Sequence, residues 1–122
     1  MSKNTTVFEY QYRDGGNFKT YGCLLLSGQD EHTEASIRQC LEWGDQFVAE
    51  QIGVPALYEE HWRQVEDGPS DLDHSFHEFI CLRAAQPKEQ DLPIWGTLAD
   101  MMKRMLAASG RWDVRLSPNC NL

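Results

Sequence analysis

Long apolar runs are scarce in this chain of 122 residues, and no run, residues 23–26 included, exceeds four. A membrane-spanning helix needs about 20 apolar residues, and a secretory signal needs an apolar core behind its basic start. The segment after Lys3 has no such core. We therefore expect no membrane span, no signal peptide and a cytoplasmic location.

Closely spaced cysteines are also absent. The four cysteines stand at positions 23, 40, 81 and 120 without a CxxC pair, which argues against zinc-ribbon and thioredoxin-like sites. Cys23, Cys40 and Cys81 fall in predicted strands or on the apolar side of a predicted helix, so we expect buried, reduced thiols. Cys120 lies in a polar tail, where we expect an exposed thiol.

Glycine motifs that bind phosphate are missing too. Gly22 and Gly28 are accompanied neither by the lysine of a P-loop nor by the third glycine of a dinucleotide-binding turn. No serine or cysteine stands in a pattern that provides it with a base, so nothing indicates nucleophilic catalysis. We expect no cofactor.

Basic residues are rare in one long stretch. Residues 30–78 contain thirteen acidic residues and two basic ones, Arg38 and Arg63, for a net charge of −11, whereas the flanking segments are slightly positive and the whole chain has −8. A surface of this charge repels nucleic acid and acidic membranes and attracts basic proteins. We therefore expect a protein partner with a basic surface.

The first half of the chain has clear secondary-structure signals. Residues 7–13 alternate between apolar and polar, residues 18–27 form a second β-rich run, and the glycine-rich link 14–17 predicts an antiparallel hairpin. Apolar residues at helical spacing from Ile37 to Ile52 predict one helix, with Gly44 on its inward side close to the sheet. Residues 55–67 predict a second helix.

The second half predicts a strand at residues 76–85, a loop at 87–93 and a helix that begins after Thr97. The apolar side of this helix contains Leu98, Met101, Met102, Met105 and Leu106, which we expect in the core. Residues 111–116 alternate and predict a last strand. The order ββααβαβ predicts one α+β domain over residues 1–122, a two-layer sandwich of a four-stranded mixed sheet with three helices mainly on one face.

Acidic residues on the outer sides of the first two helices form the leading candidate binding surface. We expect a non-enzymatic binding protein of the inhibitor or immunity type, of a size and charge known among bacterial and phage proteins, that occupies a basic site on its partner. The candidate contact residues are Glu42, Asp45, Glu59, Glu60, Trp62, Glu66 and Asp67, with Trp43, Tyr58 and Trp95 as further anchors outside the core.

Two alternatives to this binding surface remain open. The carboxylates can be a merely solvated face, and the open face of the sheet, rich in Tyr and Arg, can be the interface instead, including that of a homodimer.

One short segment is dense in potential metal ligands, namely Asp71, Asp73, His74, His77 and Glu78. Carboxylates and neutral imidazoles bind zinc, manganese and iron, and such a metal can activate water. A small metal-dependent hydrolase is therefore the alternative function. The spacing of these candidate ligands matches no known zinc motif, and neighbouring residues on a strand point to opposite faces. We therefore rank protein binding first.

Overall fold

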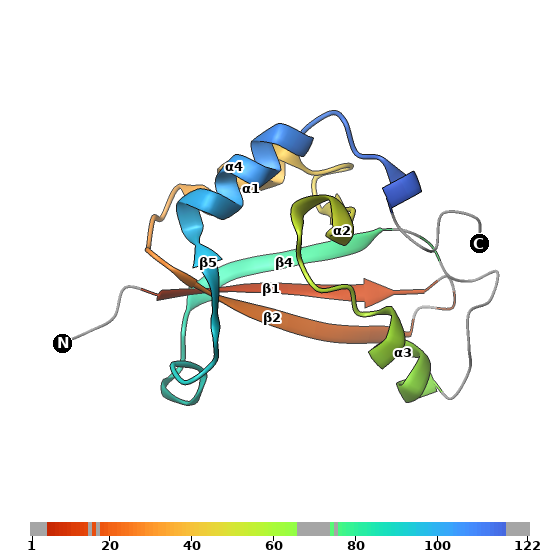
Figure 1. Cartoon of the computed structure of the whole chain (residues 1–122), viewed down its shortest axis with the longest axis horizontal. Helices are drawn as coiled ribbons and strands as arrows, with labels where there is room; N and C mark the ends of the chain where they lie inside the picture. The colour runs from red at the N-terminus through yellow and green to blue at the C-terminus, as the bar shows by residue number, and fades with distance from the viewer. Residues whose placement is uncertain (1–4, 15, 17, 66–73, 75, 117–122) are drawn as a thin grey trace.

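The computed structural model describes residues 5–14, 16, 18–65, 74 and 76–116. These residues form a mixed sheet, four α-helices and two 3-10 turns (Figure 1). The elements are β1 (Thr5–Arg13), β2 (Lys19–Ser27), α1 (Thr33–Cys40), β3 (Gln46–Phe47), α2 (Ala49–Ile52), α3 (Tyr58–Val65), β4 (His77–Ala84), η1 (Pro87–Glu89), β5 (Ile94–Thr97), α4 (Leu98–Ala108) and η2 (Val114–Leu116). The α+β class predicted from the sequence is confirmed.

Strands β1 and β2 form the predicted antiparallel hairpin, paired from Thr5 with Ser27 to Arg13 with Lys19. At its turn the Asp14 carboxylate accepts hydrogen bonds from the backbone N–H groups of Gly16, at 2.8 Å, and Phe18, at 3.2 Å. Such a side chain replaces backbone partners in tight turns. The hairpin is therefore fixed by both its alternating pattern and its turn.

The sheet has five strands in the order β3-β4-β1-β2-β5, not the four predicted. All neighbours are antiparallel except β2 and β5, which are parallel. The predicted strand at 111–116 is wrong, since these residues end in the turn η2, while β5 takes the edge beside β2. The four residues of β5, with a glycine among them and a proline before, gave too weak a strand signal.

The single helix predicted from Ile37 to Ile52 is also wrong. Helix α1 ends at Cys40, and two residues with left-handed backbone follow, Trp43 at φ 53° and Gly44 at φ 84°, before β3 and the short α2. Gly44 is exposed and approaches nothing. The apolar spacing misled because α1, β3 and α2 all place their apolar residues in the same core.

Helix α4 begins as predicted, with the Thr97 hydroxyl accepting a hydrogen bond from the backbone N–H of Asp100 at 2.9 Å. Its Leu98, Met101 and Met105 are buried. The prediction for Leu106 is wrong, because its side chain is 62% exposed. The inner side of α4 is thus narrower than the sequence suggested.

Helices α1, α2 and α4 lie over one face of the sheet, and α3 lies at the end where β1 ends and β2 begins (Figure 1). The segment after β4 passes the other face near the start of β1, where the Thr5 hydroxyl donates to Gln90 Oε1 at 3.2 Å. None of the helices in the described part of the chain is long and apolar enough to cross a membrane.

We predict that Thr97→Ala destabilises the protein by about 1 kcal/mol, because the first turn of α4 loses its side-chain cap. Urea unfolding followed by circular dichroism measures the difference. Ser36→Ala, at an exposed position inside α1, is the matched control and is expected to change stability by less than about 0.5 kcal/mol. Equal effects of the two substitutions would contradict the capping role.

Candidate functional site

Trp43 occupies the turn between α1 and β3. The turn is closed by two backbone hydrogen bonds, from Glu42 N–H to the Gln46 carbonyl at 2.8 Å and from Gln46 N–H to the Glu42 carbonyl at 2.9 Å. The indole is 74% exposed and rests against Phe76, with 5.4 Å between ring centroids. A left-handed backbone costs a non-glycine residue about 1–2 kcal/mol. A strained backbone at a residue whose large aromatic ring faces solvent is typical of functional sites, so Trp43 is a candidate binding residue.

Two carboxylates adjoin this turn. Glu42 and Asp45 are both partly exposed. Desolvation raises the pKa of the Asp45 carboxyl, and the nearby Glu78 raises it further, while Arg13 and Arg38 act against both. Arg13 makes an ion pair of 2.6 Å with Glu78. Because Arg13 is paired with Glu78, negative charges outnumber positive ones around Trp43.

Helix α3 supplies the other described members of the predicted contact set. Glu59 and Glu60 are exposed in its first turn, and Glu60 pairs with Arg63 at 3.1 Å. Trp62 is partly buried and stacks on the buried Tyr58, with ring centroids 6.2 Å apart. Tyr58 is thus a core residue and no anchor. Glu66 and Asp67 lie outside the described residues.

A buried polar network fastens α3 to the hairpin. His61 donates a hydrogen bond from Nε2 to Asp14 at 2.9 Å, and its Nδ1 atom lies 2.9 Å from the Thr20 hydroxyl. Burial raises the pKa of the Asp14 carboxyl, but hydrogen bonds from His61 and two backbone N–H groups outweigh it and leave the pKa below its ordinary value. Hydroxyl, imidazole and carboxylate stand in the order of a catalytic triad. Because Thr20 is only 1% exposed, we interpret this arrangement as structural. We call the hydrogen-bonded group of Asp14, Thr20 and His61 the clasp, because it holds α3 to the hairpin.

The turn with Trp43 and the exposed side of α3 belong to the same end of the sheet. Strand β3 pairs with Glu78 and His77 at the beginning of β4, and the clasp holds α3 to the end of β1 and the beginning of β2. Because β4 is antiparallel to β1, these positions adjoin (Figure 1). We name this region the acidic end and define it by Trp43, Glu42, Asp45, Glu59 and Glu60.

The predicted metal ligands that are described do not converge. His77 is buried in the core and accepts a hydrogen bond at Nε2 from the Leu57 N–H at 3.0 Å; burial, and then His74, lowers its pKa to about 3. Glu78 points to the opposite face, as expected for a strand, and pairs with Arg13. No three potential ligands among the described residues could hold a metal ion. Asp71 and Asp73 lie outside them.

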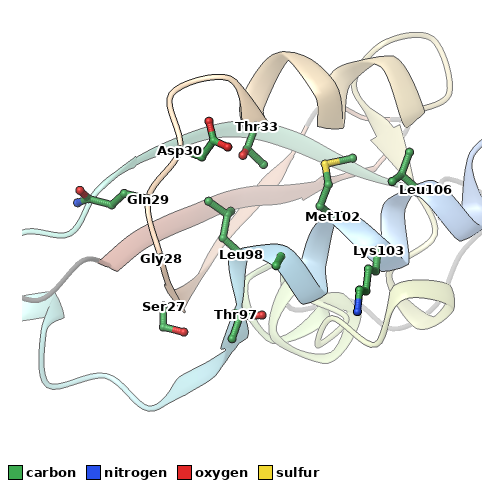
Figure 2. A pocket seen from close by; sticks show the side chains of 11 residues that line it. Ser27, Gly28, Gln29, Asp30, Thr33, Thr97, Leu98, Met102, Lys103 and Leu106 are labelled. Atoms are coloured by element: carbon green, nitrogen blue, oxygen red, sulfur yellow. The ribbon is translucent and has the colours of Figure 1, made fainter.

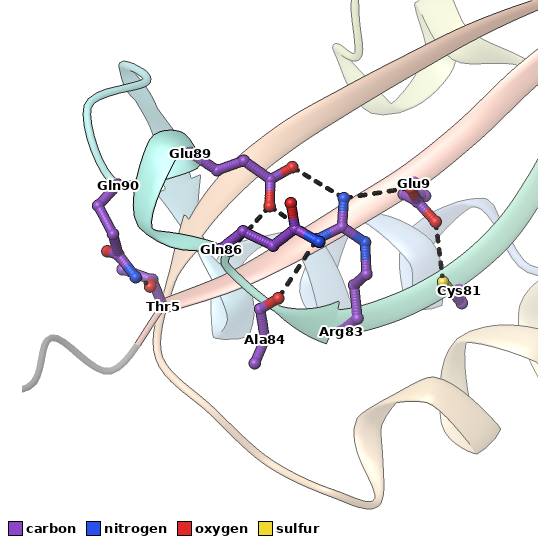
Figure 3. Close-up of polar contacts among 8 residues, drawn as sticks. All are labelled: Thr5, Glu9, Cys81, Arg83, Ala84, Gln86, Glu89 and Gln90. Carbon is purple, nitrogen blue, oxygen red and sulfur yellow. Dashed lines mark hydrogen bonds and ion pairs between the residues drawn. The ribbon is translucent and has the colours of Figure 1, made fainter.

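The open face of the sheet bears a network centred on Arg83 (Figure 3). Its guanidinium donates two hydrogen bonds to Glu89, at 2.7 and 2.8 Å, and one to Glu9 at 3.1 Å. The hydrogen bonds from Arg83, and then that from the Gln86 N–H, lower the pKa of the Glu89 carboxyl to about 2. The charges of this face therefore pair largely with one another.

Two cysteines adjoin this network. The Cys81 thiol donates to Glu9 at 3.2 Å, and burial followed by this hydrogen bond raises its pKa to about 11. Cys40 is buried as expected, whereas Cys81 is half-buried and Cys23 is exposed, contrary to prediction. Their places on the strand face without helices explain the difference. Cys120 lies outside the described residues.

A hollow of about 630 Å³ lies between α4 and the segment that follows β2 (Figure 2). Met102 and Leu106 line it from the helix, and Gln29, Asp30 and Thr33 line it from the other side. The wall formed by α4 is thus largely apolar apart from Lys103 and the capping residue Thr97, and the other wall is polar. This hollow accounts for the exposure of Leu106, which the spacing of the sequence could not separate from its buried neighbours.

Sequence reasoning named Trp43 as an anchor but missed the turn that presents it. A signal was available, because Gly44 and Asp45 are turn-forming residues in the middle of the supposed helix. No such signal pointed to the hydrogen bond between Asp14 and His61, because the two residues stand 47 positions apart in the sequence. Comparisons of the chain with models of known families, with curated proteins and with solved structures found no match.

We predict that Arg83→Met lowers stability at pH 7 and flattens its acid dependence. The folded-state pKa of Glu89, about 2, lies below the ordinary value of 4.5. The resulting stabilisation is present above about pH 4.5 and is lost as the pH falls toward 2. Urea unfolding at pH 7, 4 and 3 should therefore show a steeper loss in the wild type than in the variant. Arg63→Met, which breaks an exposed pair with Glu60, should leave the slope unchanged; parallel slopes for wild type and Arg83→Met would contradict the assignment.

Proposed function

We propose that this protein is a non-enzymatic acidic binding module of the inhibitor or immunity type, which uses the acidic end to occupy a basic site on a partner protein. The observation that carries the proposal is Trp43, an indole 74% exposed on a turn with strained backbone and flanked by carboxylates. Tryptophan is enriched among residues that dominate binding energy. The partner would provide an apolar pocket for the indole, rimmed by Lys or Arg.

The charges around Trp43 support the same conclusion. Glu42, Asp45 and Glu59 have no ion pair with a described residue, whereas Glu9 and Glu89 on the open face both form ion pairs with Arg83. Unneutralised rim charges speed encounter with an oppositely charged surface, and a buried aromatic anchor slows dissociation. The acidic end offers both, so it fits a binding role better than the open face does.

We predict that Trp43→Ala weakens binding of the partner about 30-fold, chiefly through faster dissociation, as loss of a hot-spot residue worth about 2 kcal/mol requires. The partner is first captured from the native host at low salt, identified and purified, and binding is then measured by surface plasmon resonance. Tyr21→Ala is the matched control, since Tyr21 is 67% exposed on the open face. If Tyr21→Ala weakens binding and Trp43→Ala does not, the interface is the open face instead.

We also predict that Glu42→Lys combined with Glu59→Lys slows association and reduces its dependence on salt. Charge attraction extends about 10 Å at 0.1 M salt and about 3 Å at 1 M, so it should largely disappear over this range in the wild type. Both side chains are at least partly exposed, so circular dichroism should show an intact fold. A folded double variant with the wild-type association rate and salt dependence would reduce the acidic end to a solvated surface.

A further inference from the structure

A second hollow, of about 340 Å³, lies between α2 and α3. Glu50 of α2, Ala56 of the connection, and Tyr58, Glu59 and Trp62 of α3 line it. Tyr58 and Trp62 are four positions apart, so their side chains lie on the same side of α3, and their rings stack at an interplanar angle of 22°. The hollow thus combines two nearly parallel aromatic rings with two carboxylates.

This lining selects a cation. Glu50 and Glu59 contribute two negative charges, and no Lys or Arg stands among the described residues that line the hollow. The beginning of α3 contributes only about half a positive charge, so the local charge stays negative. Tryptophan is also the strongest aromatic partner for a cation. An anionic ligand would be repelled by the two carboxylates, and a neutral ligand would gain no charge attraction from them.

The size and shape of the hollow narrow the choice of cation. A volume of about 340 Å³ is at the small end of ligand sites, which span about 300–1,000 Å³. It suits one extended side chain. Arginine stacks its flat guanidinium on aromatic rings and donates to carboxylates along its edge, whereas the lysine ammonium is compact and strongly hydrated. Trp62 provides the aromatic ring and Glu59 the carboxylate for these two interactions of arginine, on adjacent turns of one helix.

We propose that this hollow, which we call the cation pocket, binds an arginine side chain of the partner protein, with the guanidinium on Trp62 and hydrogen-bonded to Glu59. The proposal rests on the proposed function and specifies one residue of the basic partner. It gives Trp62 and Glu59 a role separate from that of Trp43. The partner would then be held at two points, an indole inserted into it and an arginine received from it.

The test uses N-acetyl-arginine amide as the probe and the full chain labelled with ¹⁵N. The chain has four tryptophans, so the indole N–H signals of Trp43, Trp95 and Trp112 serve as internal references. We expect a saturable shift confined to the Trp62 indole and nearby backbone signals, with a Kd of roughly millimolar order. N-acetyl-citrulline amide, which has the same shape without the charge, should cause no shift, and N-acetyl-lysine amide a weaker one.

Two variants of adjacent residues make the test specific. Glu59→Gln should weaken binding of the arginine probe at least about three-fold, as loss of a charged hydrogen-bond partner would, whereas Glu60→Gln should not, because Glu60 pairs with Arg63. Trp62→Leu should abolish binding in a chain that circular dichroism shows to be folded. Equal shifts with citrulline, stronger binding of lysine, or equal effects at Glu59 and Glu60 would overturn the proposal.

The test is independent of the partner, so the two proposals fail separately. If the probe does not bind but partner binding still depends on Trp43 and on salt, the cation pocket is wrong and the binding module stands. If the probe binds as described but the partner is indifferent to Trp43 and to charge, the binding module is wrong. The pocket would then be a site for a free guanidinium compound, and its assignment to a partner arginine would be withdrawn.

Discussion

The structure depends on burial of the three aromatic residues on one face of β1, the strand at the centre of the sheet. Phe8 packs against Phe47 of β3 and Phe79 of β4. The Tyr10 hydroxyl donates to the Pro55 carbonyl at 2.7 Å and so fixes the connection between α2 and α3. Tyr12 contacts Tyr58 and His61 of α3 edge-on. Each ring thus positions a different segment, and the last two determine where α3 lies, with Glu59 and the proposed cation pocket. Each large aromatic buries about 150–250 Å², so β1 is also a principal source of stability.

The negative charge that α3 contributes to the acidic end costs the fold little, because of where its carboxylates stand. Glu59 and Glu60 are in the first turn of α3, where the helix dipole favours an acidic residue by about 0.3–1 kcal/mol. Glu60 also pairs with Arg63, whereas Glu59 is compatible with local structure without an ion pair to a described residue. On the open face, by contrast, Glu9 and Glu89 both form ion pairs with Arg83. The open face thus pairs its acidic residues within the chain, whereas the acidic end retains carboxylates without an ion pair to a described residue.

The parts of the fold that the sequence predicted well are those in which local pattern and tertiary burial agree. The alternation of β1 and the cap at Thr97 are of this kind. Prediction failed from α1 to α2, where apolar residues of several elements happen to follow a single helical spacing. Such spacing indicates burial in a core, but it does not show that the backbone forms one continuous helix. The candidate site was predicted as a charge block and a set of aromatics. Its assembly at one end of the sheet was beyond prediction, since it depends on the pairing of β3 with β4 and on the contact of His61 with Asp14.

The two edge strands of the sheet are much shorter than its three central strands. The three central strands have eight or nine residues, whereas β3 has two and β5 has four. An edge strand presents unpaired backbone donors and acceptors that can recruit a strand from another molecule, and short edges with a nearby proline limit this. Here Pro93 directly precedes β5. With both borders this short, the sheet offers few unpaired backbone groups on which further copies of the chain could add as strands.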